Sequence, residues 1–154
     1  MTQATDNLRQ DALAIFQAGI QAADPYLAIK HCLQSYGKQL DIALDLNSDN
    51  AKRSGNWQKI HVIAFGKAAC AMTKAAQEII PTQLLAQPII AITNYENVTE
   101  LANIEVIGAN HPLPDQAGFA AAQRIAKIAQ QAQQGDLVLV LVSGGGSALI
   151  PFPA

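Results

Sequence analysis

The residues best suited to chemistry lie near the end of the printed sequence, where Ser-Gly-Gly-Gly-Ser occupies positions 143–147 directly after the apolar run Leu137–Val142. Glycine has no Cβ, so three glycines let the backbone bend sharply and approach a ligand closely. Successive backbone N–H groups in such a turn form a concave site for an anion. We therefore predict that Ser143, Gly144, Gly145, Gly146 and Ser147 bind a negatively charged group. A turn that merely reverses the chain is the alternative.

A lysine occupies a second junction of the same kind. Gly66 and Lys67 follow the apolar run Ile60–Phe65 and precede a helical pattern. Lys67 would open that helix, where the helix dipole disfavours a cation. A ligand phosphate or carboxylate gives a physical reason for placing a lysine there, and a solvated lysine is the alternative. The segment is not a Walker A motif, because the earlier glycine and the following Ser or Thr are missing.

A histidine begins a third such loop, His-Pro-Leu-Pro-Asp at positions 111–115. The two prolines stiffen the backbone and remove two hydrogen-bond donors. We predict that His111 hydrogen-bonds a ligand or takes part in proton transfer, with a purely structural histidine as the alternative. Asp115 is predicted to act as a helix N-cap rather than in chemistry. We assign no residue of this sequence to a metal.

The elements that must position these loops alternate between strand and helix patterns. Apolar runs predict strands over residues 60–65, 88–93, 104–107 and 137–142, and helical spacing predicts helices between the first two and the last two of them. The order predicts one α/β domain with an open, mostly parallel sheet. Because parallel strands end at one edge, Lys67, His111 and the 143–147 loop should lie together. The last strand, an unbroken branched apolar run, is predicted to be buried on both faces.

The first 55 residues follow different patterns. Apolar residues at helical spacing predict an amphipathic helix over residues 6–23. Asp24 and Pro25 then predict the start of a second helix that carries Ile29, Leu33, Tyr36 and Leu40 on one face, despite Gly37 inside it. The polar stretch 47–55 is predicted to be an exposed loop.

Composition narrows the class of protein. The 154 residues are 50% hydrophobic and carry a net charge of −2, which suits one globular domain and argues against nucleic acid or an anionic membrane as partner. No apolar run reaches the roughly 20 residues that a membrane span needs. The polar start predicts no signal peptide. Cys32 and Cys70, which share no CxxC spacing, are predicted to be buried thiols. We therefore expect a cytoplasmic location.

Three motifs together resemble one protein family. Phe-Gly-Lys-Ala-Ala-Cys-Ala-Met at 65–72, Asn-His-Pro-Leu-Pro-Asp at 110–115 and Leu-Val-Ser-Gly-Gly-Gly-Ser-Ala-Leu at 141–149 occur in that order, followed by Pro-Phe-Pro at 151–153. The ordered set resembles the N-terminal domain of class II glycerate kinases, which are glycerate 2-kinases often labelled hydroxypyruvate reductases. The resemblance covers nearly all of the chain.

The resemblance implies a fold and an activity. It implies a Rossmann-like sheet, a second α/β domain, and an active site in the cleft between the two. It also implies transfer of the ATP γ-phosphoryl group to the 2-hydroxyl of D-glycerate with a divalent metal such as Mg²⁺. Lys67 occupies the position of a family active-site lysine, and residues 143–147 match the Gly-rich loop. Family chains are more than twice as long, so we expect residues 1–154 to be a truncated first domain that is inactive without its C-terminal partner domain.

Two other interpretations remain open. A non-catalytic module that binds a sugar phosphate or another anion would use the same Ser/Gly-rich loop without a nucleotide. A fragment of a longer protein would expose a sheet edge and tend to aggregate. A dehydrogenase is disfavoured, because no GxGxxG motif follows the first strand of the predicted sheet.

Overall fold

The computed structural model describes residues 3–45 and 51–152. Its centre is a sheet of parallel strands in the order β6-β5-β4-β7. These strands are β4 (Ile60–Phe65), β5 (Ile89–Asn94), β6 (Ile104–Ala109) and β7 (Leu137–Val142). The α/β fold with a parallel sheet and flanking helices is therefore confirmed, and β4 and β7 have the bounds that their apolar runs predict.

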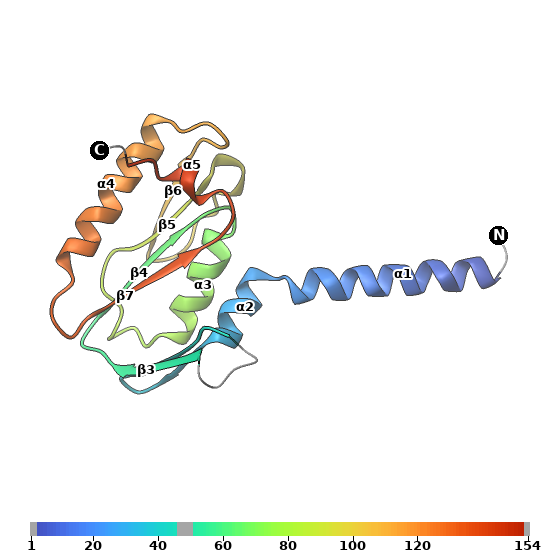
Figure 1. Ribbon diagram of the computed structural model, residues 1–154, viewed down its shortest axis with the longest axis horizontal. Coiled ribbons are helices and arrows are strands. Elements are labelled where there is room, and N and C mark those ends of the chain that lie inside the picture. Colours follow the sequence, from blue (N-terminus) through green and yellow to red (C-terminus); the bar gives the residue numbers. More distant parts are fainter. Residues whose placement is uncertain (1–2, 46–50, 153–154) are drawn as a thin grey trace.

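Two helices cover opposite faces of this sheet (Figure 1). Helix α3 (Ala69–Ile79) connects β4 to β5, and helix α4 (Gln116–Gln131) connects β6 to β7. Alternate side chains of β4 divide between the two faces: Val62 belongs to the core under α3, and Ile63 to the core under α4. Short helices η2 (Tyr95–Asn97) and α5 (Gly146–Leu149) follow β5 and β7.

The amino-terminal part begins with helix α1 (Gln3–Ala22), as predicted. Figure 1 shows α1 projecting away from the rest of the molecule, and every side chain from Thr5 to Ala23 is exposed. The apolar stripe that makes this helix amphipathic therefore has no cover within the described residues. Asp24 caps the next helix, α2 (Pro25–Cys32), by accepting hydrogen bonds from the N–H groups of Tyr26 and Leu27.

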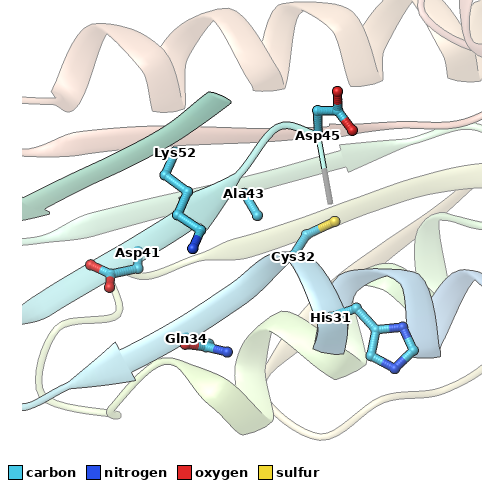
Figure 2. A pocket seen from close by; sticks show the side chains of 7 residues that line it. All are labelled: His31, Cys32, Gln34, Asp41, Ala43, Asp45 and Lys52. Carbon is cyan, nitrogen blue, oxygen red and sulfur yellow. The ribbon is translucent and has the colours of Figure 1, made fainter. Parts of the chain in front are cut away.

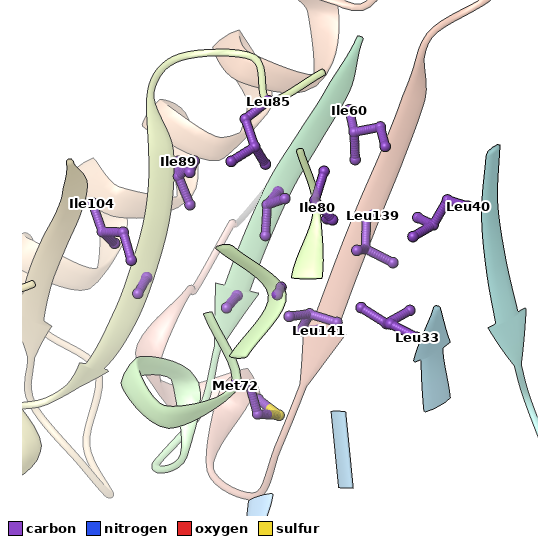
Figure 3. Packing of buried hydrophobic residues seen from close by; sticks show 14 of the residues in the cluster. Leu33, Leu40, Ile60, Met72, Ile80, Leu85, Ile89, Ile104, Leu139 and Leu141 are labelled. Carbon is purple, nitrogen blue, oxygen red and sulfur yellow. The ribbon is translucent and has the colours of Figure 1, made fainter. Parts of the chain in front are cut away.

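The second predicted helix is too long. Helix α2 ends at Cys32, and the chain continues into an antiparallel hairpin of β1 (Leu33–Tyr36) and β2 (Gln39–Ala43). Gly37 has φ +64° in the two-residue turn, a conformation that favours a hairpin over a helix. Leu33 and Leu40 are 3% and 1% exposed and pack beside Leu139 and Leu141 (Figure 3). Leucines seven residues apart fit a helix and a hairpin equally well, and tertiary packing favours the hairpin.

The predicted loop over residues 47–55 is also corrected in part. Residues 52–56 form a polar edge strand, β3 (Lys52–Asn56), that pairs antiparallel with β2. Residues 46–50 lie outside the described residues. The sequence of β3 shows no alternation of apolar residues, and its side chains are mostly exposed. Backbone pairing with β2, rather than burial of its side chains, therefore keeps this strand in the sheet.

The prediction that β7 is buried on both faces is wrong. Strand β7 lies at the edge of the sheet, and Val140 and Val142 are 47% and 61% exposed. Leu139 and Leu141, which point to the α3 side, are buried. Among the described helices, none combines the length and the apolar character that crossing a membrane requires.

Candidate anion-binding site

Two loops at the carboxyl end of the sheet are joined by hydrogen bonds. The N–H of Ser143 donates to the carbonyl oxygen of Phe65, and the N–H of Lys67 donates to that of Gly144, each at 3.0 Å. The N–H of Ala68 donates to the Ser143 hydroxyl oxygen, also at 3.0 Å. The Lys67 loop after β4 and the Ser-Gly loop after β7 thus form one unit, in which Ser143 has a structural contact in addition to its predicted ligand role.

Glycine at position 66 is required by this junction. Its φ is +115°, and a Cβ there would stand 2.3 Å from the Ser143 hydroxyl oxygen and 2.4 Å from the Ser143 carbonyl oxygen. Both distances are far below van der Waals contact. Gly66 therefore permits the turn and also lets the two loops approach each other.

The three predicted elements of the site meet at Gly145, which has φ +89°. A Cβ on Gly145 would lie 3.1 Å from His111 Nε2 and 3.7 Å from Lys67 Cε. No atom of the residues that the structure describes, apart from Gly144 and its two chain neighbours, lies within 4 Å of the corresponding position on Gly144. The lysine, the histidine and the glycine loop are therefore neighbours, as the parallel topology predicts, and the backbone at Gly144 is open to a ligand.

The loop after β5 supplies residues that the sequence reasoning missed. The Asn97 side-chain amide donates to the carbonyl oxygen of Lys67 at 3.1 Å and to Asn94 Oδ1 at 2.8 Å. The amide of Asn94 in turn donates to the Glu96 carboxylate. The position of this loop, directly after a predicted parallel strand like the other three loops, was the signal that could have placed it at the site.

Glu96 brings a negative charge to the same edge. Hydrogen bonds from its own backbone N–H and from Asn94 lower the pKa of the Glu96 carboxyl, and electrostatic interactions with His111 and Lys67 lower it further. Lys67 and Glu96 also line one open hollow of about 530 Å³, together with Cys70, Lys74 and Asn97. The site therefore pairs a cationic, amide-lined side with one ionised carboxylate.

Asp115 has the capping role that the sequence predicts. Its carboxylate accepts from the N–H of Gly118 at 2.8 Å and from the Tyr95 hydroxyl at 2.6 Å. The Tyr95 hydrogen bond, followed by that from Gly118, lowers the pKa of the Asp115 carboxyl. This contact ties the β5 loop to the start of α4 and so helps hold the rigid His111 loop in place.

A second hollow, of about 250 Å³, lies between the end of α2 and the small antiparallel sheet (Figure 2). It is lined by His31, Cys32, Gln34, Asp41, Ala43, Asp45 and Lys52. Figure 1 places this sheet at the opposite end of the molecule from α5, far from the Ser-Gly loop. Cys32 there and Cys70 near Lys67 are free thiols, half-buried rather than fully buried as predicted.

Two further polar residues, His61 and Asp136, lie close to each other in the folded chain. His61 is 7% exposed, and its Nε2 lies 3.4 Å from Asp136 Oδ2. Asp136 also accepts a hydrogen bond from the Gln133 N–H in the turn before β7. Within residues 3–45 and 51–152, no three His, Cys, Asp or Glu side chains gather as a metal site.

Comparison with known proteins identifies the family. The family described as "Domain of unknown function (DUF4147)" matches residues 11–154. A glycerate 2-kinase of Pyrococcus horikoshii is 35% identical over 147 residues, which are 96% of this chain and 31% of that protein. A D-glycerate 2-kinase of Thermotoga maritima is 29% identical over 149 residues, again 96% of this chain and 31% of the relative.

Solved structures give the same result. A Pyrococcus horikoshii protein superimposes with TM-score 0.79 at 33% identity, covering 95% of this chain and 31% of that one. Glycerate kinase of Thermotoga maritima superimposes with TM-score 0.72 at 28% identity, covering 97% and 31%. The chain therefore spans about a third of the length of the relatives it matches. It belongs to the DUF4147 domain family and is a homologue of glycerate kinases.

Proposed function

We propose that this chain supplies the amino-terminal part of a glycerate 2-kinase active site. In the proposed reaction the C2 hydroxyl oxygen of D-glycerate bonds to the γ-phosphorus of ATP and its proton passes to the solvent, while the bond from that phosphorus to the β-phosphate bridging oxygen breaks and ADP leaves. The remaining two thirds of a family-length chain would complete the site. The meeting of Lys67, His111 and the open Gly144 backbone around Gly145 is the observation that supports this proposal best.

The roles of the side chains follow from charge and position. Phosphoryl transfer needs positioning and charge neutralisation more than covalent chemistry. We assign to Lys67 a point charge that neutralises either the transferring phosphoryl group or the glycerate carboxylate. The backbone N–H groups of residues 143–147 would bind an anionic group of the same ligand, and His111 would orient the hydroxyl that attacks.

The proposed metal has no cluster of its own among the described side chains, as noted above. The residues present therefore do not form a resident Mg²⁺ site, and no step of the proposal passes through one. In the proposal, the divalent cation is the one that accompanies ATP.

The proposal is tested by ligand titration of the ¹⁵N-labelled chain with D-glycerate, with ATP and Mg²⁺, and with glucose 6-phosphate. We expect D-glycerate or ATP to shift the amide signals of Lys67 and Gly144–Gly146. Lys67→Met should reduce the affinity for the ligand by at least about tenfold, because a charge-assisted contact contributes about 1.5–3 kcal/mol.

Lys59→Met is the matched control, because Lys59 flanks the other end of β4 and donates to the Gln83 carbonyl oxygen instead. It should leave binding unchanged. Binding of glucose 6-phosphate alone would replace the kinase proposal by the anion-binding module. Equal effects of the two lysine variants would remove Lys67 from the site.

A further inference from the structure

The Glu96 carboxylate is held in place by a buried side chain at the end of β5. Asn94 is 9% exposed, and its amide nitrogen donates a hydrogen bond to Glu96 Oε2. The oxygen of the same amide accepts from Asn97, which also donates to the carbonyl oxygen of Lys67. One chain of hydrogen bonds therefore fixes the Glu96 carboxylate relative to the backbone of Lys67.

The orientation of the Asn94 amide favours a carboxylate at position 96. Its oxygen lies 2.8 Å from the Asn97 amide nitrogen and 3.4 Å from the Thr93 hydroxyl, so its nitrogen is left to face Glu96. An ionised carboxylate accepts hydrogen bonds at about four positions. The bonds from Asn94 and from the Glu96 backbone N–H therefore leave acceptor capacity for a ligand.

Glu96 also faces the two residues that are predicted to bind the anion. Electrostatic interactions with His111 and Lys67 help lower the pKa of its carboxyl, and Lys67 and Glu96 line the same open hollow. The carboxylate is therefore ionised at neutral pH. Its charge repels a second negative group on a ligand, whereas Lys67 attracts the first.

These two sides of the site favour one kind of ligand. An anionic group fits beside Lys67 and the open backbone of Gly144. A hydroxyl group fits beside Glu96, because a hydrogen bond to an ionised oxygen is roughly twice as strong as one to a neutral oxygen. An anion without hydroxyl groups gains no such bond from the carboxylate. Glu96 is exposed, so solvent screening limits the preference to a severalfold effect.

We propose that Glu96 is a specificity-determining residue of the anion-binding site, and that it selects anions with hydroxyl groups over plain anions of the same type. The inference rests on the proposed function, because D-glycerate is the hydroxylated anion named there. It assigns to Glu96 the ligand's hydroxyl groups, and leaves to Lys67 and the Ser-Gly loop its negative charge.

Paired titrations of the ¹⁵N-labelled chain test this selectivity. D-Glycerate is compared with propionate, which has the same carbon chain and carboxylate but no hydroxyl group, and glucose 6-phosphate is compared with inorganic phosphate. We expect the hydroxylated member of a pair to bind more tightly. Glu96→Gln should reduce that preference by about two- to fivefold, the range for one exposed charged contact. The glutamine oxygen can still accept from Asn94, so the variant removes the charge and keeps the support.

Glu100→Gln is the matched control, because it changes the net charge equally in the same loop. The residues that line the hollow include its exposed neighbour Thr99, and Leu101, but not Glu100. This variant should leave the preference for the hydroxylated member of each pair unchanged. An undiminished preference in Glu96→Gln, or an equal decrease in the two variants, would overturn the proposal.

The carboxyl-carbon NMR signal of Glu96 gives a direct readout in the parent chain. At neutral pH, D-glycerate should move this signal more than propionate does, and the Glu100 signal should move with neither. A merely structural Glu96 would respond equally to the two members of a pair, and that result would contradict its contact with the hydroxyl groups.

Failure of the proposed function has a different signature. If glucose 6-phosphate binds and D-glycerate does not, the kinase proposal fails, and the second pair of ligands alone decides the role of Glu96. If D-glycerate binds and Glu96→Gln keeps the full preference, the kinase proposal stands and the role of Glu96 is overturned. Absence of binding by all four ligands would overturn both.

Discussion

The parallel sheet and helix α1 carry similar apolar side chains and bury them to opposite extents. Ile63 and Ile92 of the sheet are 1% and 0% exposed, whereas Ile15 and Phe16 of α1 are 74% and 65% exposed. Burying one such side chain stabilises a fold by about 1.5–3 kcal/mol. The sheet gains this stabilisation because α3 and α4 are supplied by the same chain, and α1 does not because no described element covers it.

A core truncation is expected to have the largest effect and tests the comparison directly. Ile92→Ala should lower the free energy of unfolding by about 3–5 kcal/mol, because the cavity left in a packed core cannot collapse completely. Urea denaturation followed by circular dichroism measures this. Ile15→Ala on α1 is the matched control, with an expected change within about 0.5 kcal/mol. Similar losses in the two variants would contradict the contrast between the two regions.

The sequence predicts the apolar strands of the parallel sheet well, but it does not predict which apolar faces are covered. The bounds of β4 and β7 were predictable, because buried parallel strands are visible in a sequence as apolar runs. The convergence of Lys67 and His111 on Gly145 was also predictable, because parallel strands bring the loops that follow them to one edge of the sheet. The exposure of one face of β7, at Val140 and Val142, was not predictable. A strand's sequence shows that its face is apolar, and does not show which element covers it.

The hairpin of β1 and β2 shows a second limit. Leu33 and Leu40 fit one face of a helix, and only their contact with the sheet beside Leu139 decides for strands. Gly37 was the local signal for the turn. The loop after β5 was missed for a different reason: Asn94, Glu96 and Asn97 form no compact motif, so their site is visible only from the topology.

A glycine substitution sharpens the comparison at the carboxyl edge of the sheet. Gly66→Ala should cost about 2–4 kcal/mol, because the new Cβ would overlap the Ser143 hydroxyl and carbonyl oxygens at a positive φ. Gly37→Ala, also at positive φ but with no other described residue within 4 Å of the new Cβ, should cost only about 1 kcal/mol. Thermal and urea unfolding of the two variants give the difference, and a Gly66→Ala protein as stable as Gly37→Ala would refute the close approach of the loops.

The hairpin supplies an intermediate case between the two regions. Leu40→Ala should lower the free energy of unfolding by about 2–3 kcal/mol, because Leu40 is 1% exposed in the core shared with α3. Leu44→Ala, where the side chain is 66% exposed just after β2, should change it by no more than about 0.5 kcal/mol. If Leu40→Ala is equally mild, the small sheet does not dock on the parallel sheet.

A smaller effect is expected where Tyr95 contacts Asp115. Tyr95→Phe should raise the pKa of the Asp115 carboxyl toward its ordinary value of 3.8, because its leading hydrogen-bond donor is lost. A depressed carboxyl pKa stabilises the folded state above the unfolded pKa, and that stabilisation disappears as the pH falls through the folded pKa. The variant should therefore be less stable than the parent at neutral pH and approach it below pH 3.8. Carboxyl-carbon NMR titration and acid unfolding measure both changes, and an unmoved Asp115 pKa would rule out the contact.

The smallest effect is expected on α1 itself. Phe16→Ser removes the largest apolar side chain of its exposed stripe, which is 65% exposed and gains almost no burial on folding. The free energy of unfolding should change by less than about 0.5 kcal/mol, while loss of the apolar surface should reduce self-association at high concentration. Urea unfolding and sedimentation velocity separate the two readouts. A loss above about 1 kcal/mol would mean that α1 packs on the sheet in solution, and the two regions would then differ in degree rather than in kind.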